Sequence, residues 1–211
     1  MEPAMIGDGG MNRKRGRCTS KSAAATLALL VWAESAQAQN CERFQTLSLE
    51  AQSLVLASND RSDPECTAFL LKNLGDARYE PAARTVVKYL DFEWQKPQLR
   101  DDQSHLMWYG DFFPAFQALY SIGEKSSPVI IEYLGSRDFP PLERQRAVML
   151  VVGMGQPRMA DLVSRVQAFV VASRAAGDPV IAGRLWRAAN EAAAMCGQPA
   201  CQAALTGPTT K

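Results

Sequence analysis

Apolar side chains recur every three to four residues along most of the chain, and strict alternation of apolar and polar positions never lasts more than a few residues. This period is typical of amphipathic helices, whereas alternation would indicate half-buried strands. The pattern is clearest where Phe116, Leu119 and Ile122 share one helix face, Gly123 ends that helix and Pro128 starts the next. We therefore predict an all-α fold made of helix pairs.

Prolines and glycines mark the ends of these helices. Proline suits the first helical turn because its missing N–H has no intrahelical partner there, and glycine just beyond a periodic segment is a typical stop. The predicted stops are Gly75, Gly123, Gly135, Gly155, Gly177 and Gly197. The predicted helices, about eight or nine, span 48–58, 64–74, 81–92, 114–122, 128–134, 141–154, 157–174, 179–195 and a short segment from Pro199. Short connections of about two to six residues predict that consecutive helices pack as antiparallel neighbours.

The first 38 residues have the pattern of a secretory signal peptide. Five basic residues precede an apolar run from Ala23 to Trp32, and small residues lead up to a cleavage point after Ala38. The run is too short to span a bilayer, which takes about 20 apolar residues. Acidic residues upstream of the basic segment suggest that Met11 is the true start. The alternative is that this segment forms a buried N-terminal helix. If it is a signal peptide, we expect a protein that is exported to a bacterial periplasm or beyond and has no transmembrane segment after cleavage.

Charge and length narrow the classes of partner. The leader holds five of the 23 basic and three of the 22 acidic residues, so the mature chain carries a net charge near −1. Nucleic acid and anionic membrane surfaces are bound by an excess of Lys and Arg, so this balance argues against both. About 170 residues remain, enough for one domain. We place it at 39–205, followed by a frayed tail at 206–211.

Four cysteines remain after the leader, two near each end of the mature chain. An even number in an exported chain indicates disulfides, and loop-closure entropy favours local partners. We predict the pairs Cys41–Cys66 and Cys196–Cys201. A metal site is the alternative, but the spacings match no zinc motif and His105 is the only histidine.

Three segments resemble one another, and the best copy runs Ala115-Phe-Gln-Ala-Leu-Tyr-Ser-Ile-Gly123, then Pro128 and a closing Leu134. Comparable patterns occupy 68–90 and, more loosely, 146–162, and the apolar face alone persists at 180–195. This pattern resembles a HEAT or HEAT-like repeat. The resemblance implies a short α-solenoid of antiparallel helix pairs that acts as a binding surface or scaffold. It implies no catalytic residue and no cofactor.

The spacing from Gly75 to Gly123 is longer than such a repeat should be, and the extra length is the segment 91–113, called the insertion below. It combines aromatic side chains with charges, the composition that interface hot spots favour. The candidate partner-binding residues are Trp94, Arg100, His105, Trp108 and Tyr109. The alternative is that the aromatic residues of the insertion only cover the open side of the core.

These patterns lead to a primary hypothesis and two others. The primary hypothesis is a non-catalytic exported module that binds a protein or peptide partner in the cell envelope, with an oligomeric state that the sequence does not indicate. The second is a small envelope enzyme with a metal or acid–base site, since Asp101 and His105 can share a helix face. A lone histidine among acids is more often a solvated surface residue. The third is a structural accessory domain.

Overall fold

The computed structural model describes residues 41, 43–94, 112–153 and 158–206. Contacts between residues divide the chain between Gln39 and Asn40, and all the described residues belong to the second unit. The expected signal peptide and the start at Met11 lie outside the described residues. Throughout those residues the structure is helical and contains no strand, so the all-α prediction is confirmed. None of the described helices has the length and apolarity needed to cross a membrane.

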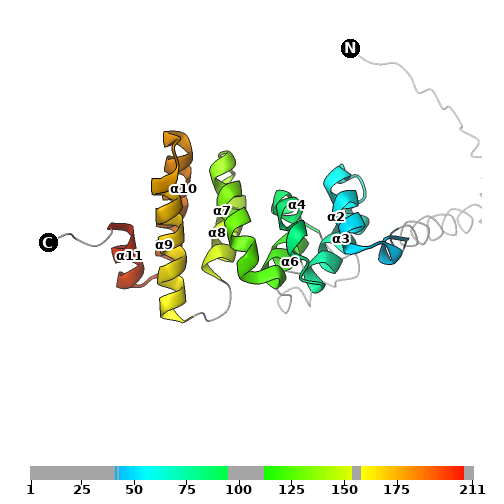
Figure 1. Ribbon diagram of the computed structural model, residues 1–211, viewed down its shortest axis with the longest axis horizontal. Helices are drawn as coiled ribbons and strands as arrows, with labels where there is room; N and C mark the ends of the chain where they lie inside the picture. Colours follow the sequence, from blue (N-terminus) through cyan, green and yellow to red (C-terminus); the bar gives the residue numbers. More distant parts are fainter. Residues whose placement is uncertain (1–40, 42, 95–111, 154–157, 207–211) are drawn as a thin grey trace, which may run out of the picture. The chain divides into compact units, whose positions relative to one another are not determined.

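The helices follow in order along the chain (Figure 1). They are η1 (Arg43–Thr46), α2 (Leu49–Ser58), α3 (Pro64–Asp76), η2 (Glu80–Ala82), α4 (Ala83–Val86), η3 (Val87–Tyr89), α6 (Pro114–Ile122), η5 (Gly123–Ser126), α7 (Ser127–Ser136), α8 (Pro141–Val152), α9 (Met159–Ala175), α10 (Pro179–Cys196) and α11 (Pro199–Thr206), where η marks a 3₁₀ helix. Thr206, which the sequence analysis assigned to the tail, is therefore the last residue of α11.

Local capping explains why three of these helices, α2, α3 and α10, begin close to where the sequence predicts. Ser48, Asp63 and Asp178 each stand just before a helix, and their side chains accept a backbone N–H of its first turn. These bonds satisfy donors that have no partner within the helix. At the other end, Gly123 and Gly197 have φ values of 79° and 64°, which L-residues rarely adopt, and each ends a helix as predicted.

The prediction of one continuous helix over 81–92 is wrong. The segment is divided into η2, the four-residue α4 and η3. Apolar side chains here are buried on almost every side, including Ala82, Ala83, Val86, Val87 and Leu90. Within 81–90 only Pro81, Arg84 and Lys88 are exposed, so tertiary packing sets most of the backbone, and the adjacent β-branched valines lower its helix propensity.

Two predicted helix stops are wrong for a different reason. Gly75 lies inside α3 and Gly135 inside α7, and neither has a positive φ. A Cβ on Gly135 would lie 3.0 Å from Cγ2 of Ile181, and one on Gly75 would meet Ala118. These glycines allow helices to approach each other closely. The predicted stop at Gly155 lies outside the described residues.

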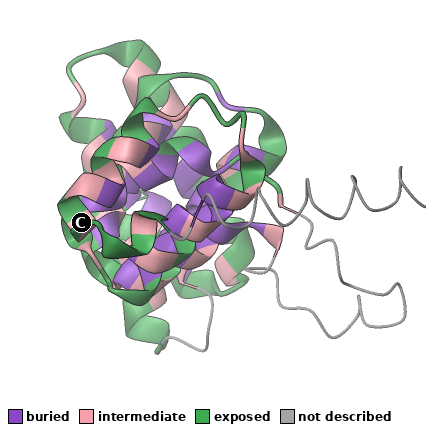
Figure 2. Ribbon diagram, turned by 90° about the vertical axis from the view of Figure 1, so that its right-hand side faces the viewer, coloured by how far each residue is buried: buried purple, intermediate pink, exposed green. Residues whose placement is uncertain are grey.

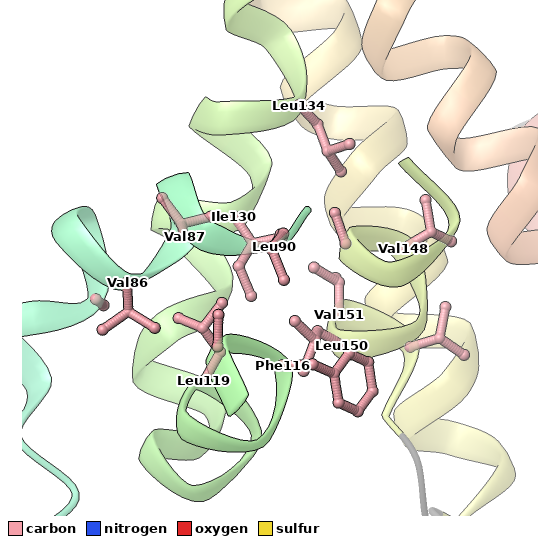
Figure 3. Packing of buried hydrophobic residues seen from close by; sticks show 14 of the residues in the cluster. Val86, Val87, Leu90, Phe116, Leu119, Ile130, Leu134, Val148, Leu150 and Val151 are labelled. Atoms are coloured by element: carbon pink, nitrogen blue, oxygen red, sulfur yellow. The ribbon is translucent and has the colours of Figure 1, made fainter. Parts of the chain in front are cut away.

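One apolar core runs through the described helices. Figure 2 shows buried residues on their inward faces and exposed residues on their outward faces. In the close view of Figure 3, Leu90, Leu119 and Ile130 gather with Phe116 and Leu150, although they come from three different helices and the segment after η3. Fully burying side chains of this size stabilises a fold by about 1.5 to 3 kcal/mol each.

Helix neighbours follow the predicted antiparallel pairing only in part. α9 packs along α10, as consecutive helices should, and the two lie side by side in Figure 1. α3, however, packs mainly on α6, which follows it only after the insertion. α10 lies against both α7 and α8, so α9 is not the helix that covers α7. Helices that are distant in the sequence therefore pack together, and these contacts could not be predicted from the short connections between consecutive helices.

Both ends of this unit carry a disulfide in the pairing that the sequence predicts. Cys41 pairs with Cys66 at the start of α3, with a Cα–Cα distance of 5.1 Å. Cys196, the last residue of α10, pairs with Cys201 of α11 across 6.4 Å. Each disulfide therefore joins a terminal segment to a helix of the core.

Candidate functional site

The two ends of the insertion meet at one point. The backbone N–H of Trp94 donates to the carbonyl oxygen of Phe112 at 2.9 Å. Trp94 and Phe112, the described residues on either side of 95–111, therefore lie next to each other; residues 95–111 themselves lie outside the described residues. We call this region, Leu90 to Trp94 with Phe112, Phe113 and the side chains that hold them, the insertion base.

Aromatic side chains fix the insertion base to the core. Phe92 and Phe113 are both buried, at 8% exposure each. Trp94 and Phe112 are half-buried and pack against the same core. The Phe92 ring meets the Tyr89 ring edge-on, with centroids 6.5 Å apart, an arrangement that aromatic pairs favour. Aromatic rings therefore anchor both the segment that enters the insertion and the segment that leaves it.

Arg146 of α8 holds the insertion base from one side. Its guanidinium carbon lies 3.6 Å from the centroid of the Phe113 ring, a close cation–π contact. Its Nη1 also donates to the carbonyl oxygen of Leu90 at 3.0 Å. One side chain therefore contacts the segment that enters the insertion and the segment that leaves it.

Arg61, in the turn between α2 and α3, holds the entering segment from another direction. Its Nη1 pairs with Oδ2 of Asp91 at 2.8 Å, and its Nη2 donates to the carbonyl oxygen of Lys88 at 2.6 Å. The guanidinium also lies over the Tyr89 ring, 4.7 Å from its centroid. The bond to Asp91 raises the pKa of Arg61 above its already high ordinary value, so this cation is permanent.

The turn that presents Arg61 is itself shaped by side-chain hydrogen bonds. The Asn59 side-chain oxygen accepts the N–H of Arg61, and the Asp60 carboxylate accepts the N–H of Ser62, each at 2.9 Å. Such turns tolerate the left-handed backbone of Arg61, whose φ is 66°. The Tyr89 hydroxyl donates to the carbonyl oxygen of Leu56 at 2.6 Å and ties the end of α2 to η3.

Of the residues predicted to contact a partner, Trp94 alone falls within the described residues, and it lies at the insertion base, half-buried against the core. Arg100, His105, Trp108 and Tyr109 lie outside them. The same holds for Asp101, with which His105 was expected to share a helix face. Their role in binding therefore stays a prediction.

The two arginines that hold the insertion base were not among the residues predicted from the sequence. Arg61 lies 30 residues from Asp91, and Arg146 lies 56 residues from Leu90. Neither belongs to a local motif. One signal was present in the sequence: Arg146 directly precedes the apolar run 147–152, and a cation that is partly buried there requires a partner.

A separate polar network lies between α7 and α8. The hydroxyl of Tyr133 donates to Oε1 of the buried Glu143 at 2.6 Å, and Nη2 of Arg137 lies 3.7 Å from the same oxygen. Burial, reinforced by this hydrogen bond, raises the pKa of Tyr133 well above its ordinary value. Tyr133 therefore stays protonated and acts as a hydrogen-bond donor to the carboxylate.

Tyr133 also lines a cavity of about 270 Å³ between η3 and α7, which Arg84, Lys88 and Glu132 border as well. Arg84 is paired with Glu132 at 2.8 Å. Because Arg84 and Glu132 neutralise each other at the rim, this pair offers no net charge to a ligand. We find no nucleophile–base pair in the network of Tyr133 and Glu143.

Among the described residues, one group has metal-ligand atoms close together: Cys41, Asp63 and Cys66. The two sulfur atoms are bonded to each other in the disulfide. The Asp63 carboxylate accepts the backbone N–H of Cys66 at 3.0 Å as the cap of α3. These donors are committed to structural bonds, so the group does not fit a resident metal ion.

Comparison of the chain with protein-family models, curated proteins and solved structures finds no match in any of the three.

Proposed function

We propose that this protein is an exported, non-catalytic module of HEAT-like helix pairs that binds a protein or peptide partner through the insertion at 91–113. The observation that carries the proposal is the insertion base. Trp94 and Phe112 join its two ends, and Arg146 and Arg61 hold the entering segment to distant helices.

Such anchoring favours binding. A loop whose ends are held at one point has fewer conformations to lose when it contacts a partner, so less of the interaction free energy is lost to ordering. The insertion carries the aromatic and charged residues typical of hot spots, among them Trp108, Tyr109 and Arg100. If the insertion only covered the open side of the core, its two ends would not need to be held by Arg61 and Arg146.

The repeat architecture agrees with this role. In a solenoid each helix pair packs on its neighbours and leaves an extended face for partners. The packing of α3 on α6 brings two successive pairs together as such stacking requires, whereas α7 packs on α10 rather than on α9 of the next pair. Export to a bacterial periplasm or beyond is supported by the leader pattern and by two disulfides, which form in oxidising compartments.

The test is affinity capture from a cell-envelope extract, followed by affinity measurement with the purified partner. Trp108→Ala is expected to weaken binding by roughly 30-fold or more, the loss typical of an interface hot spot. Trp186→Ala is the matched control, because it makes the same substitution at an exposed tryptophan, at 39%, on α10, far along the chain from the insertion. Its affinity should equal that of the parent chain.

Two outcomes would contradict the proposal. If Trp108→Ala and Tyr109→Ala both bind the partner with parental affinity, the insertion is not the interface. If the purified chain turns over a substrate and His105→Ala abolishes turnover, the protein is an enzyme and the insertion is its site.

A further inference from the structure

The two disulfides differ in how far solvent reaches their sulfur-bearing residues. Cys41 and Cys66 are both buried, with exposures of 6% and 5%. Cys201 is fully buried, whereas its partner Cys196 is partly exposed. A thiolate must reach a disulfide sulfur in order to attack it. Access therefore distinguishes Cys196 from the other three cysteines.

Cys196 also lines a cavity of about 360 Å³ formed by α8, α9 and α10. The neighbouring walls come from Met149, Leu162 and Met195, so the surroundings are mainly apolar. Flexible methionine side chains adapt to ligands of different shape. The cavity is large enough for a small thiol compound or for a cysteine side chain of another protein.

We propose that Cys196 is a thiol-exchange site at which a dithiol reductant opens the Cys196–Cys201 disulfide and thereby releases α11. A thiolate of the reductant attacks Sγ of Cys196 and forms a mixed disulfide. The Cys196–Cys201 bond breaks, and Cys201 leaves as a thiolate that takes up a proton. The second thiol of the reductant then attacks the mixed disulfide, so that the reductant becomes a disulfide and Cys196 a thiol.

Attack at Cys196 rather than at Cys201 follows from burial. Cys201 packs against α9 and α10 with no exposed surface, so an external thiolate cannot approach its sulfur while α11 is in place. The buried Cys41–Cys66 pair is protected in the same way. Exchange is therefore selective for one of the two disulfides, and within it for one sulfur.

Opening the disulfide frees a short helix. α11 has eight residues, and its buried side chains are Cys201 and Leu205. A helix of this length is not stable alone in water, so it depends on the disulfide and on these two contacts. Once it is released, the faces of α9 and α10 that it covers become accessible. This redox control of the C-terminal surface is independent of the function proposed for the insertion.

The experiment is limited reduction of the oxidised mature chain with dithiothreitol, followed by alkylation and peptide mass spectrometry. We expect Cys196 and Cys201 to be labelled at least tenfold faster than Cys41 and Cys66. Hydrogen exchange in 199–206 should rise in the partly reduced protein. Cys196→Ser/Cys201→Ser should show that same exchange without reductant, and Cys41→Ser/Cys66→Ser should not.

The route through the cavity has its own test. Met149→Trp narrows the cavity and should slow reduction of Cys196–Cys201 at least threefold. Leu142→Trp, on an exposed position of the same helix that does not line the cavity, should leave the rate unchanged. Equal reduction rates for the two disulfides, or unchanged exchange in 199–206 after reduction, would overturn the proposal. An unslowed Met149→Trp variant would overturn the cavity as the route.

Discussion

Gly75 of α3 and Ala118 of α6 approach so closely that a Cβ on Gly75 would lie 2.6 Å from the Cα of Ala118. The contact is with backbone, which cannot move aside as a flexible side chain can. It lies where α3 packs on α6, the helix that begins directly after the insertion. The small residues at this crossing therefore set the distance between α3 and α6, the helix that directly follows the insertion base.

Gly75→Ala is expected to lower the free energy of unfolding by about 1 to 3 kcal/mol, because the added methyl group forces α3 and α6 apart. The gain in helix propensity, up to about 1 kcal/mol, only partly offsets this cost. Urea unfolding followed by circular dichroism measures the difference.

Gly183→Ala is the matched control. Gly183 lies inside α10, and a Cβ there would meet nothing within 4 Å. This variant should be more stable than the parent by about 0.5 to 1 kcal/mol, since alanine restricts the unfolded chain and favours the helix. Equal effects of the two substitutions would show that the contact with Ala118 is not limiting.

Sequence patterns predicted the parts of the fold that depend on neighbouring residues. Both limits of α6 were predicted to the residue, because Pro114 starts the helix and Gly123 ends it through local backbone effects. The start of α10 was predicted for the same reason, through Pro179 and the Asp178 cap. Such signals act over a few residues and are visible without the fold.

Features that depend on contacts between distant segments were not predicted. Gly75 was interpreted as a helix stop. A glycine in a sequence does not show whether it adopts a positive φ at a helix end or allows a neighbouring helix to approach closely. Arg61 and Arg146 had no visible partners, since their bonds cross 30 and 56 residues of chain. The insertion was recognised from its length and composition, but the way it is attached to the core depends on these two side chains.

Arg146→Lys tests the attachment of the insertion. Lysine keeps the charge but loses the planar group that stacks on Phe113, and it does not reproduce the geometry of the bond to Leu90. We expect a loss of roughly 1 to 2 kcal/mol in unfolding free energy. Hydrogen exchange should also accelerate in 88–94. Arg174→Lys, an exposed arginine on α9, should change neither quantity.

The bond between Tyr133 and Glu143 predicts a specific dependence on alkaline pH. The fold raises the pKa of Tyr133 above its unfolded value of about 10, so it favours the protonated phenol. This contribution is fully present below about pH 10 and is lost as the pH rises above that value. The parent protein should therefore lose stability above about pH 10.

Tyr133→Phe is expected to be less stable at pH 7 by roughly 1 to 3 kcal/mol, because the buried Glu143 loses a hydrogen-bond donor. Its stability should also fall less steeply above about pH 10. Urea unfolding from pH 7 to pH 11 measures both effects. Tyr89→Phe should flatten the curve independently, since burial raises the pKa of Tyr89 as well. An alkaline slope of Tyr133→Phe equal to that of the parent would contradict the assignment.

The two disulfides should differ in their contribution to stability as well as in their access. Cys41–Cys66 spans 25 residues and Cys196–Cys201 spans five. On the chain-entropy estimate, closing the longer loop contributes roughly 3.5 kcal/mol and closing the shorter one roughly 2 kcal/mol. Thermal unfolding of the two double Cys→Ser variants should therefore give the larger fall in Tm for Cys41→Ser/Cys66→Ser. A larger fall in Tm for Cys196→Ser/Cys201→Ser would contradict this estimate. It would show that α9 and α10, the two helices that α11 contacts, depend on the Cys196–Cys201 disulfide, so that opening it unfolds more of the chain than α11.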